Sequence, residues 1–278
     1  MSSLELSIIL CISSLAAGLL GALTGLGGGV VIVPLLALAF HVDIHYAIGA
    51  SLMSVIATSS GSASAYVREG FSNVRIGMFL EIATTLGALL GAWLATITPT
   101  KGIAITFGAI LIFSAIMSNR RRTMPDPNAP ADPLANKLRL NGTYPVDGKK
   151  QPYNVRRVPL GFGMMFGAGT LSGLLGIGSG AVKVLAMDEA MQMPFKVSTT
   201  TSNFMIGVTA AASAGIYLSR GYIDPSLVMP VTLGVLAGSL MGAKLLVRIH
   251  TQRLRIIFAF VIAALGIEMI YSGLTGKL

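Results

Sequence analysis

Apolar stretches of helical length alternate with short polar breaks along nearly the whole chain. Most of them approach the ~20 residues that a helix needs to cross a bilayer. The segments that we expect to be long helices are 6–24, 46–67, 76–97, 102–118, 159–175, 196–218, 226–247 and 256–273. Two shorter apolar runs, 30–40 and 181–192, complete the pattern. It predicts an all-α, polytopic transmembrane protein.

Two glycine-rich stretches of similar sequence precede the short runs. Residues 24–29 read Thr-Gly-Leu-Gly-Gly-Gly, and residues 175–180 read Leu-Gly-Ile-Gly-Ser-Gly. Glycine breaks a helix and leaves backbone groups unpaired. In lipid such breaks are tolerated only where the backbone is buried in protein or lines a watery cavity. We interpret the two stretches as halves of one binding site.

The breaks belong to an internal repeat with a constant offset of 151 residues. The following pairs match without gaps: Leu20/Leu171, Leu23/Leu174, Gly25/Gly176, Gly27/Gly178, Gly29/Gly180, Val31/Val182, Ser51/Ser202, Tyr66/Tyr217, Gly70/Gly221, Gly87/Gly238, Leu89/Leu240, Gly91/Gly242 and Phe107/Phe258. A repeat of this length indicates a duplicated structural unit. We divide the chain into a first transmembrane repeat (1–118), a linker (119–157) and a second transmembrane repeat (158–278).

The linker is rich in proline and in basic residues, which is typical of a segment outside the membrane. The positive-inside rule places it in the cytoplasm. If each glycine-rich stretch is a broken or re-entrant helix, sixteen of the 20 Lys and Arg residues fall inside. If each is instead a kink in one spanning helix, the repeats are parallel and the basic residues of 248–255 fall outside. The 13 residues 180–192 would also reach only about 20 Å. We therefore predict inverted repeats in the cell (inner) membrane, a common transporter design.

Composition narrows the class of protein further. Only 11% of the 278 residues are charged and the mean hydropathy is +0.76, which excludes an ordinary soluble domain. The net charge of +9 lies in loops between apolar runs, so it indicates membrane orientation and not nucleic-acid binding. The single cysteine, Cys11, excludes an intramolecular disulfide. With no catalytic triad, P-loop Lys-Ser/Thr or Cys/His cluster, we expect no enzyme activity, no cofactor and no metal site.

The glycine-rich stretches predict an anion cradle, because helix starts present free N–H groups and a positive dipole end. The residues assigned to it are Gly25, Gly27, Gly28, Gly29, Gly176, Gly178, Ser179 and Gly180. A dinucleotide loop is the weaker alternative, since neither stretch follows a strand. A second alternative role for such glycines is close packing of helices, which we expect for the pairs Gly87/Gly91 and Gly238/Gly242.

Two charged residues lie inside apolar segments, where ionisable groups are costly and mark functional sites. Lys183 falls in the first turn after Gly180, and we place it in the substrate site. The alternative is a lysine that reaches the surface or pairs with Asp188 or Glu189. Glu81 is a candidate carrier of a coupling ion, or else a partner of Arg75.

Hydroxyl groups form one face on each of two predicted helices. Ser51, Ser54 and Thr58 share one face, and Thr199, Ser202 and Asn203 share another. We assign Ser51, Ser202 and Asn203 to the substrate site, with Asn203 the more informative because a buried amide needs partners. The alternative is that these hydroxyls bond only the carbonyls of their own helix.

The phrase Gly21-Ala-Leu-Thr-Gly-Leu-Gly-Gly-Gly-Val-Val-Ile-Val-Pro34, its echo at Gly173-Leu-Leu-Gly-Ile-Gly-Ser-Gly180, and the two-half layout resemble the TauE/SafE family of membrane permeases. The resemblance covers nearly all of the chain except 119–157. The family glycines correspond to Gly25, Gly27, Gly28, Gly29, Gly176, Gly178 and Gly180, followed in the first half by Pro34. The second half departs from the pattern, with Ser179 in place of a glycine and Leu185 where Pro34 would match.

The resemblance implies a secondary transporter of small sulfur-containing anions such as sulfite, sulfoacetate or other organosulfonates. It also implies outward, ion-gradient-coupled transport, with H+ or Na+ as the coupling ion. The expected partners are thus a small anion, a coupling ion and the lipid bilayer, with a homodimer as a further possibility. Two alternatives are a cation or metal permease using Glu81, and a membrane scaffold or sensor acting through the basic linker.

Overall fold

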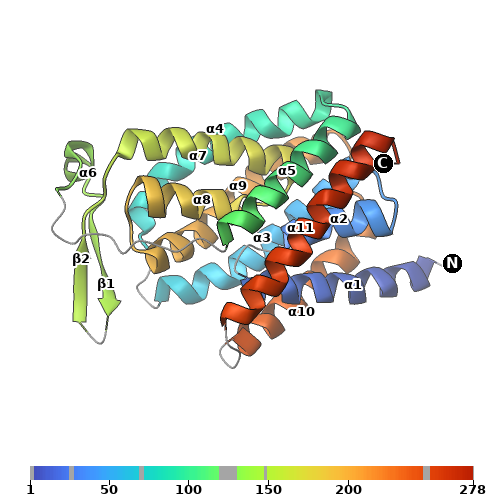
Figure 1. Ribbon diagram of the computed structural model, residues 1–278, viewed down its shortest axis with the longest axis horizontal. Coiled ribbons are helices and arrows are strands. Elements are labelled where there is room, and N and C mark those ends of the chain that lie inside the picture. Colours follow the sequence, from blue (N-terminus) through green and yellow to red (C-terminus); the bar gives the residue numbers. More distant parts are fainter. Residues whose placement is uncertain are drawn as a thin grey trace.

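The computed structural model describes residues 3–24, 28–68, 72–118, 130–146, 149–246 and 251–277. Its helices pack into one elongated bundle, with a small hairpin at one end (Figure 1). The first half comprises α1 (Ser3–Thr24), α2 (Gly29–Pro34) continued by the π-helical turn η1 (Leu35–Ala39), α3 (Ile44–Arg68), α4 (Val74–Ile97) and α5 (Thr100–Ser118). The second half comprises α7 (Val158–Leu175), α8 (Gly180–Leu185) continued by η2 (Ala186–Ala190), α9 (Phe195–Ser219), α10 (Pro225–Leu246) and α11 (Thr251–Thr275). The predicted all-α architecture is confirmed, and each apolar run corresponds to a helix.

Helix packing repeats between the halves. Helix α1 packs on α10, and its counterpart α7 packs on α4. Likewise α4 packs on α9, and its counterpart α10 packs on α3. The remaining large contacts join equivalent helices, α3 with α9 and α5 with α11. Exchanging the two halves therefore leaves these six pairs unchanged.

Glycine residues allow the closest of these crossings. A Cβ atom on Gly87 of α4 would overlap the carbonyl oxygen of Phe166 on α7. One repeat length later, a Cβ atom on Gly238 of α10 would overlap the carbonyl oxygen of Leu15 on α1. Small residues bring helix backbones into contact in this way in membrane proteins. The packing role expected for Gly87 and Gly238 agrees with this geometry.

Equivalent connections lie at opposite ends of the bundle. At the hairpin end, the connection from α3 to α4 carries Asn73, whose amide donates to the Tyr153 hydroxyl of the hairpin. At the other end, the connection from α9 to α10 carries Tyr222, whose ring stacks on His45 near the start of α3. Helix α3 has 25 residues, or about 37 Å, and separates the two ends. An inverted repeat requires this arrangement.

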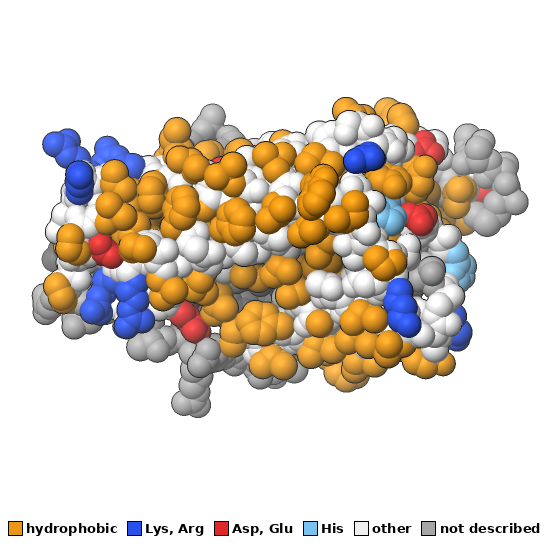
Figure 2. Space-filling view, turned by 90° about the horizontal axis from the view of Figure 1, so that it is seen from above, with side chains coloured by type: hydrophobic (Ala, Val, Ile, Leu, Met, Phe, Trp, Pro, Cys, Tyr) orange, Lys and Arg blue, Asp and Glu red, His pale blue; other side chains and the backbone are white. Residues whose placement is uncertain are grey.

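The outer surface is predominantly apolar along the bundle. Within the described residues, three helical stretches are long and apolar enough to cross a membrane: Val74–Ile97, Thr100–Met117 and Val158–Leu175. Figure 2 shows hydrophobic side chains across the middle of one face and Lys and Arg side chains toward its ends. Large side chains of α4, such as Trp93 and Ile97, are exposed on the outside. Lipid, and not water, suits such a surface.

The linker contains more regular structure than its composition indicated. Its described part forms a short helix, α6 (Pro133–Lys137), and the antiparallel strands β1 (Gly142–Val146) and β2 (Lys149–Tyr153). The side chains of Leu140, Tyr153 and Val155 are buried in one apolar cluster with helix side chains that include Ile76 and Leu80. The hairpin module is thus packed onto the helical core.

Candidate substrate and coupling site

The two glycine-rich breaks meet in the interior. The Ser51 hydroxyl, on α3 of the first half, donates to the carbonyl oxygen of Gly176 in the second half, at 2.7 Å. A Cβ atom on Gly29 would lie 3.1 Å from the same carbonyl oxygen. The structure therefore brings Gly29, Gly176 and Ser51 together, although 147 positions separate the two glycines.

A serine on each central helix faces the start of the short helix in its own half. The Ser51 hydroxyl lies 3.4 Å from the carbonyl oxygen of Gly29, and the Ser202 hydroxyl lies 3.4 Å from that of Gly180. Both serines and both glycines are related by the offset of 151 residues. The repeat seen in the sequence thus extends to individual contacts at the breaks.

The second break has an unusual backbone. Gly176 and Gly178 adopt positive φ angles of 67° and 69°, and Ser179 follows with a φ of 45°. The left-handed region costs a residue with a side chain roughly 1–2 kcal/mol. Ser179 is 3% exposed, and its hydroxyl has no hydrogen-bond partner among the described residues. A buried hydroxyl at a strained position is a candidate ligand-binding group.

The first break is only partly described. Gly28 is the residue before α2, and its carbonyl oxygen accepts from the N–H groups of Val31 and Ile32. Gly28 and Gly29 are both buried. Gly25 and Gly27 lie outside the described residues.

Lys183 is fully buried and hydrogen-bonded within a short polar chain. Its Nζ donates to the Thr209 hydroxyl at 2.5 Å. The Thr209 hydroxyl in turn lies 2.7 Å from Oε1 of Glu81. The chain links α8, α9 and α4, so both halves of the molecule contribute a charged residue to it. The Thr209 hydroxyl accepts from Lys183, and its one proton has two acceptors, Oε1 of Glu81 and the carbonyl oxygen of Met205 at 2.9 Å.

The polar chain leaves one strong acceptor unused. Glu81 is 8% exposed, and among the described residues its Oε2 has no hydrogen-bond partner. Thr85 approaches the other oxygen, Oε1, at 3.3 Å. A buried charge is stable only when it is paired and hydrogen-bonded. Oε2 can therefore take up a proton or a small cation.

Across the described ranges, no three His, Cys, Asp or Glu side chains gather closely enough to hold a metal ion. The polar chain of Lys183, Thr209 and Glu81 contains one carboxylate and one ammonium group.

The contacts of the charged residues bear on the structural alternatives to these roles. Lys183 donates to Thr209 on α9, not to the surface. Arg75, the alternative partner for Glu81, donates through Nη1 to the carbonyl oxygen of Arg139 at 2.9 Å. Glu81 is instead held by threonine hydroxyls.

The hydroxyl faces divide into two kinds of residue. Ser54, Thr58 and Thr199 bond carbonyl oxygens of their own helices, as the structural alternative predicted. Ser51 and Ser202 reach the breaks instead. Asn203 is half-buried beside Ser202, and no contact among the described residues ties its amide to a break.

Thr209 is a site residue that the sequence reasoning missed. Threonine is common in apolar helices, where it usually bonds its own helix. The repeat holds the signal that could have found it, because Thr209 stands 151 positions after Thr58. Its position on the hydroxyl-rich helix α9 would then have placed it near the breaks.

Comparisons with known proteins agree with the architecture. Residues 10–269 match the model of the family described as Sulfite exporter TauE/SafE. The chain is 28% identical over 277 residues to the probable membrane transporter protein YunE of Bacillus subtilis (strain 168), covering 96% of this chain and 98% of that one.

Two further relatives carry similar names. The probable membrane transporter protein YdhB of Bacillus subtilis is 29% identical over 82% of this chain and 85% of its own. The probable membrane transporter protein MJ0441 of Methanocaldococcus jannaschii is 24% identical over 94% of each chain. No solved structure matches. With a family match over nearly its whole length and a bundle of apolar helices, the chain belongs to the TauE/SafE family of membrane transporters.

Proposed function

We propose that this protein is a secondary transporter of small sulfur-containing anions, such as sulfite, sulfoacetate or other organosulfonates. The observation that carries the proposal is the buried Lys183–Thr209–Glu81 chain, which begins one helical turn from the second break. The N–H group of Lys183 donates to the carbonyl oxygen of Ser179 at 3.0 Å, so the cation and the break are parts of one turn. A buried cation next to strained, hydroxyl-bearing backbone suits an anionic substrate.

In this proposal the anion binds between the two breaks. Lys183 supplies the charge, Ser179 supplies an unpartnered hydroxyl, and the backbone of both breaks supplies further polar groups. Ser51 and Ser202 hold the carbonyl oxygens of Gly176 and Gly180 away from the anion. The site is asymmetric, because the residue equivalent to Lys183 in the first half is Ile32.

Alternating access follows from the repeated packing. In this proposal the protein lies in the cell (inner) membrane. Its two halves are inverted repeats, and the linker is on the cytoplasmic side. Rocking of one half against the other would open the breaks to one face at a time. Glycine-lined crossings such as that of α4 and α7 permit small sliding movements of packed helices.

Glu81 is the proposed carrier of the coupling ion. Binding of H+ or Na+ at Oε2 would neutralise Glu81 and leave the Lys183 ammonium for the anion. Ion and anion binding are then linked, and each raises the affinity for the other. The outward direction and the ion coupling rest on the resemblance to the family. Glu81→Gln should retain exchange of anion between two sides and lose its dependence on a pH or sodium gradient.

The decisive experiment is ligand-dependent thermal unfolding of the purified full-length protein. A ligand at about 100 times its Kd adds roughly 2.7 kcal/mol to the free energy of unfolding. We expect sulfite or a sulfonate to raise the Tm, and Lys183→Met to abolish that increase. Lys196→Met, which removes an exposed lysine from α9, is the matched control. An equal increase in the wild type and in Lys183→Met would remove Lys183 from the site.

The same measurement tests a cation permease, which the unpartnered Oε2 of Glu81 supports. In that case cations alone raise the Tm, and Glu81→Gln abolishes the effect. A scaffold or sensor acting through the linker predicts no stabilisation by either class of ion. Deletion of 123–150 would then abolish function, whereas a transporter core would still move its substrate.

A further inference from the structure

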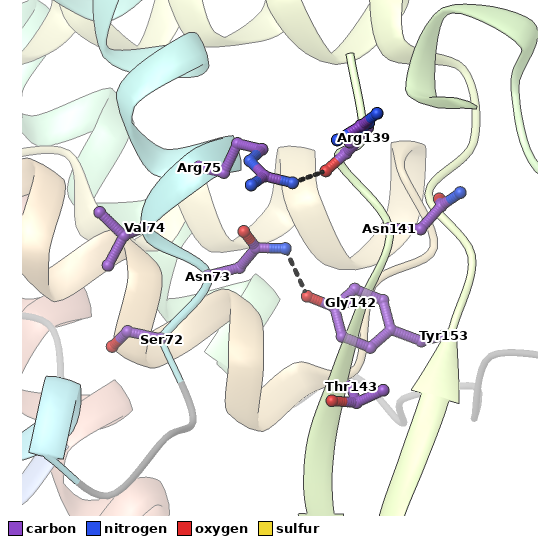
Figure 3. Close-up of a pocket in the computed structure, with 9 residues that line it drawn as sticks. All are labelled: Ser72, Asn73, Val74, Arg75, Arg139, Asn141, Gly142, Thr143 and Tyr153. Atoms are coloured by element: carbon purple, nitrogen blue, oxygen red, sulfur yellow. Dashed lines mark hydrogen bonds between the residues drawn. The ribbon is translucent and has the colours of Figure 1, made fainter. Parts of the chain in front are cut away.

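An open cleft separates the hairpin module from the start of α4, outside the apolar helices. Its volume is about 320 Å³, within the range of small-molecule sites. One wall comprises Asn73 and Arg75 at the start of α4, and the other comprises Arg139, Thr143 and Tyr153 of the linker (Figure 3). No acidic side chain is among the described residues that line it. The cleft is therefore basic and polar.

Two arginines stand at one end of the cleft. Both side chains are exposed, and Arg75 uses one N–H group to bond the carbonyl oxygen of Arg139. The guanidinium of Arg139 has no acceptor within the part of the chain that the structure describes. Paired guanidinium groups are the usual protein partners of phosphate and related oxyanions, because their N–H groups match the oxyanion geometry.

Tyr153, on the linker wall of the cleft, adds a neutral donor. The Tyr153 hydroxyl accepts from the Asn73 amide at 2.7 Å, which leaves its own proton available to a ligand. Burial raises the pKa of Tyr153 to about 12, so the hydroxyl keeps this proton at physiological pH. The Asn73 side chain also caps α4, accepting from the N–H group of Ile76, and its geometry is fixed.

We propose that this cleft is a second binding site, distinct from the transport site, for a phosphate group. The ligand bridges the hairpin and α4, with Arg75 and Arg139 on its oxyanion and Tyr153 as a third donor. The volume exceeds that of a bare ion, so the group belongs to a larger molecule. Two sources share this chemistry, a free phosphorylated metabolite and the headgroup of an anionic lipid. The inference does not depend on the proposed transport function.

The test is calorimetric titration of the full-length protein with inorganic phosphate, in nanodiscs of zwitterionic lipid. We expect saturable binding that Arg139→Gln and Arg75→Gln each weaken about tenfold or more. Lys137→Gln is the matched control, since it removes one positive charge from the same module outside the cleft. Tyr153→Phe should weaken binding by a smaller factor. Circular dichroism and gel filtration show whether each variant is folded.

The outcomes separate this site from the transport site. Lys183→Met should leave phosphate binding unchanged, whatever it does to transport. Absence of phosphate binding in the zwitterionic nanodiscs would overturn the proposal. Equal phosphate binding by Arg139→Gln, Arg75→Gln and Lys137→Gln would overturn it as well.

The source of the phosphate group is decided by a second set of nanodiscs that contain phosphatidylglycerol. Competition between this lipid and inorganic phosphate, lost in Arg139→Gln, identifies a lipid headgroup. Unchanged phosphate affinity in both kinds of nanodisc identifies a soluble phosphorylated compound. In either case the arginines carry the binding.

Discussion

A single threonine hydroxyl joins the two buried charges of this transporter. Lys183 and Glu81 each come from a different half, and Thr209 stands between them. Hydrogen bonds to charged groups contribute more to stability than bonds between neutral groups, and a buried charge that loses its partner is strongly destabilising. The hydroxyl therefore supplies a hydrogen bond to each of the two charges.

Thr209→Val should remove this connection with little change of volume. We expect the free energy of unfolding to fall by about 2–4 kcal/mol, because both charged groups lose a partner. Because the proposal places the Lys183–Thr209–Glu81 hydrogen-bond chain in the transport site, anion exchange in liposomes should fall as well. Thermal unfolding and exchange of labelled substrate measure the two effects.

Thr200→Val is the control for that substitution. Thr200 is also buried on α9, and among the described residues its hydroxyl bonds only the carbonyl oxygens of Lys196 and Val197 in its own helix. Its loss should cost less than about 1 kcal/mol. Similar losses in Thr209→Val and Thr200→Val would show that the polar chain has no special role.

At this scale the sequence predicts candidates but not their contacts. Lys183 and Glu81 stand out because charges inside apolar helices are rare. Their meeting point cannot be predicted from spacing, since 102 residues separate them and a third helix supplies the bridge. The hydroxyl faces are equally ambiguous from sequence. Among the described residues of these faces, Ser51 and Ser202 are the ones with hydrogen bonds to the breaks.

Among the elements, the crossings of α4 with α7 and of α1 with α10 are set by glycine. At both crossings a carbonyl oxygen of one helix occupies the space that a glycine leaves on the other. Overpacking a tight contact typically costs 1–3 kcal/mol. Because the crossings are related by the repeat, equivalent substitutions should have similar effects.

Gly87→Ala and Gly238→Ala should each lower the free energy of unfolding by about 1–3 kcal/mol. Gly167→Ala is the matched control, because nothing lies within 4 Å of its added Cβ on α7. That substitution should be neutral or stabilise the helix by up to about 1 kcal/mol. Denaturation in detergent measures all three, and a neutral Gly87→Ala would mean that the helices move apart at no cost.

The hairpin illustrates where element prediction from the sequence failed. Long apolar helices were predicted within a few residues, because their lengths and flanking loops are unambiguous. The linker sequence shows no strand pattern, because it contains six prolines and many charges and has no apolar period. Its order comes from contacts with the helical core, such as the bond from Asn73 to Tyr153, which no local pattern reveals.

The same tyrosine makes the stability of the protein sensitive to alkaline pH. The pKa of Tyr153 rises from 10.0 to about 12 on burial, so the unfolded chain loses this proton first as the pH rises. The stabilisation is complete below pH 10 and is lost between pH 10 and 12. Across this window the loss amounts to roughly 2–3 kcal/mol.

Tyr153→Phe should therefore reduce the fall in the free energy of unfolding between pH 10 and 12. The free energy difference between wild type and variant is largest below pH 10 and shrinks above it. Tyr144→Phe removes a half-buried hydroxyl from β1 of the same hairpin. It should leave the alkaline decrease in the free energy of unfolding unchanged, since Tyr153 is retained. The same alkaline decrease in Tyr153→Phe as in the wild type would show that another group causes it.

Taken as a whole, the molecule combines a symmetric scaffold with an asymmetric charge pair. Helix pairs, glycine crossings and serine contacts repeat at an offset of 151 residues. The charges do not, because the residues equivalent to Lys183 and Glu81 are Ile32 and Thr232. In the proposed transporter, the symmetric packing would allow two alternative arrangements of the halves, and the single charge pair would serve one substrate site.

The proposed inverted repeats predict opposite sidedness for equivalent positions. Arg75 precedes Ser226 by 151 residues, and both are exposed at the start of equivalent helices. In a Cys11→Ser background, a membrane-impermeant maleimide should label Ser226→Cys on intact cells. It should label Arg75→Cys only after the membrane is opened, because the connection from α3 to α4 adjoins the basic linker.

Lys137→Cys on α6 serves as the reference for the linker side and should behave like Arg75→Cys. Parallel repeats would place Arg75→Cys and Ser226→Cys on the same side of the membrane, since equivalent positions would then share an orientation. Labelling of both from outside, or of neither, would therefore contradict inverted repeats. Reversed sidedness of all three would instead keep the inversion and place the linker outside, against the distribution of basic residues.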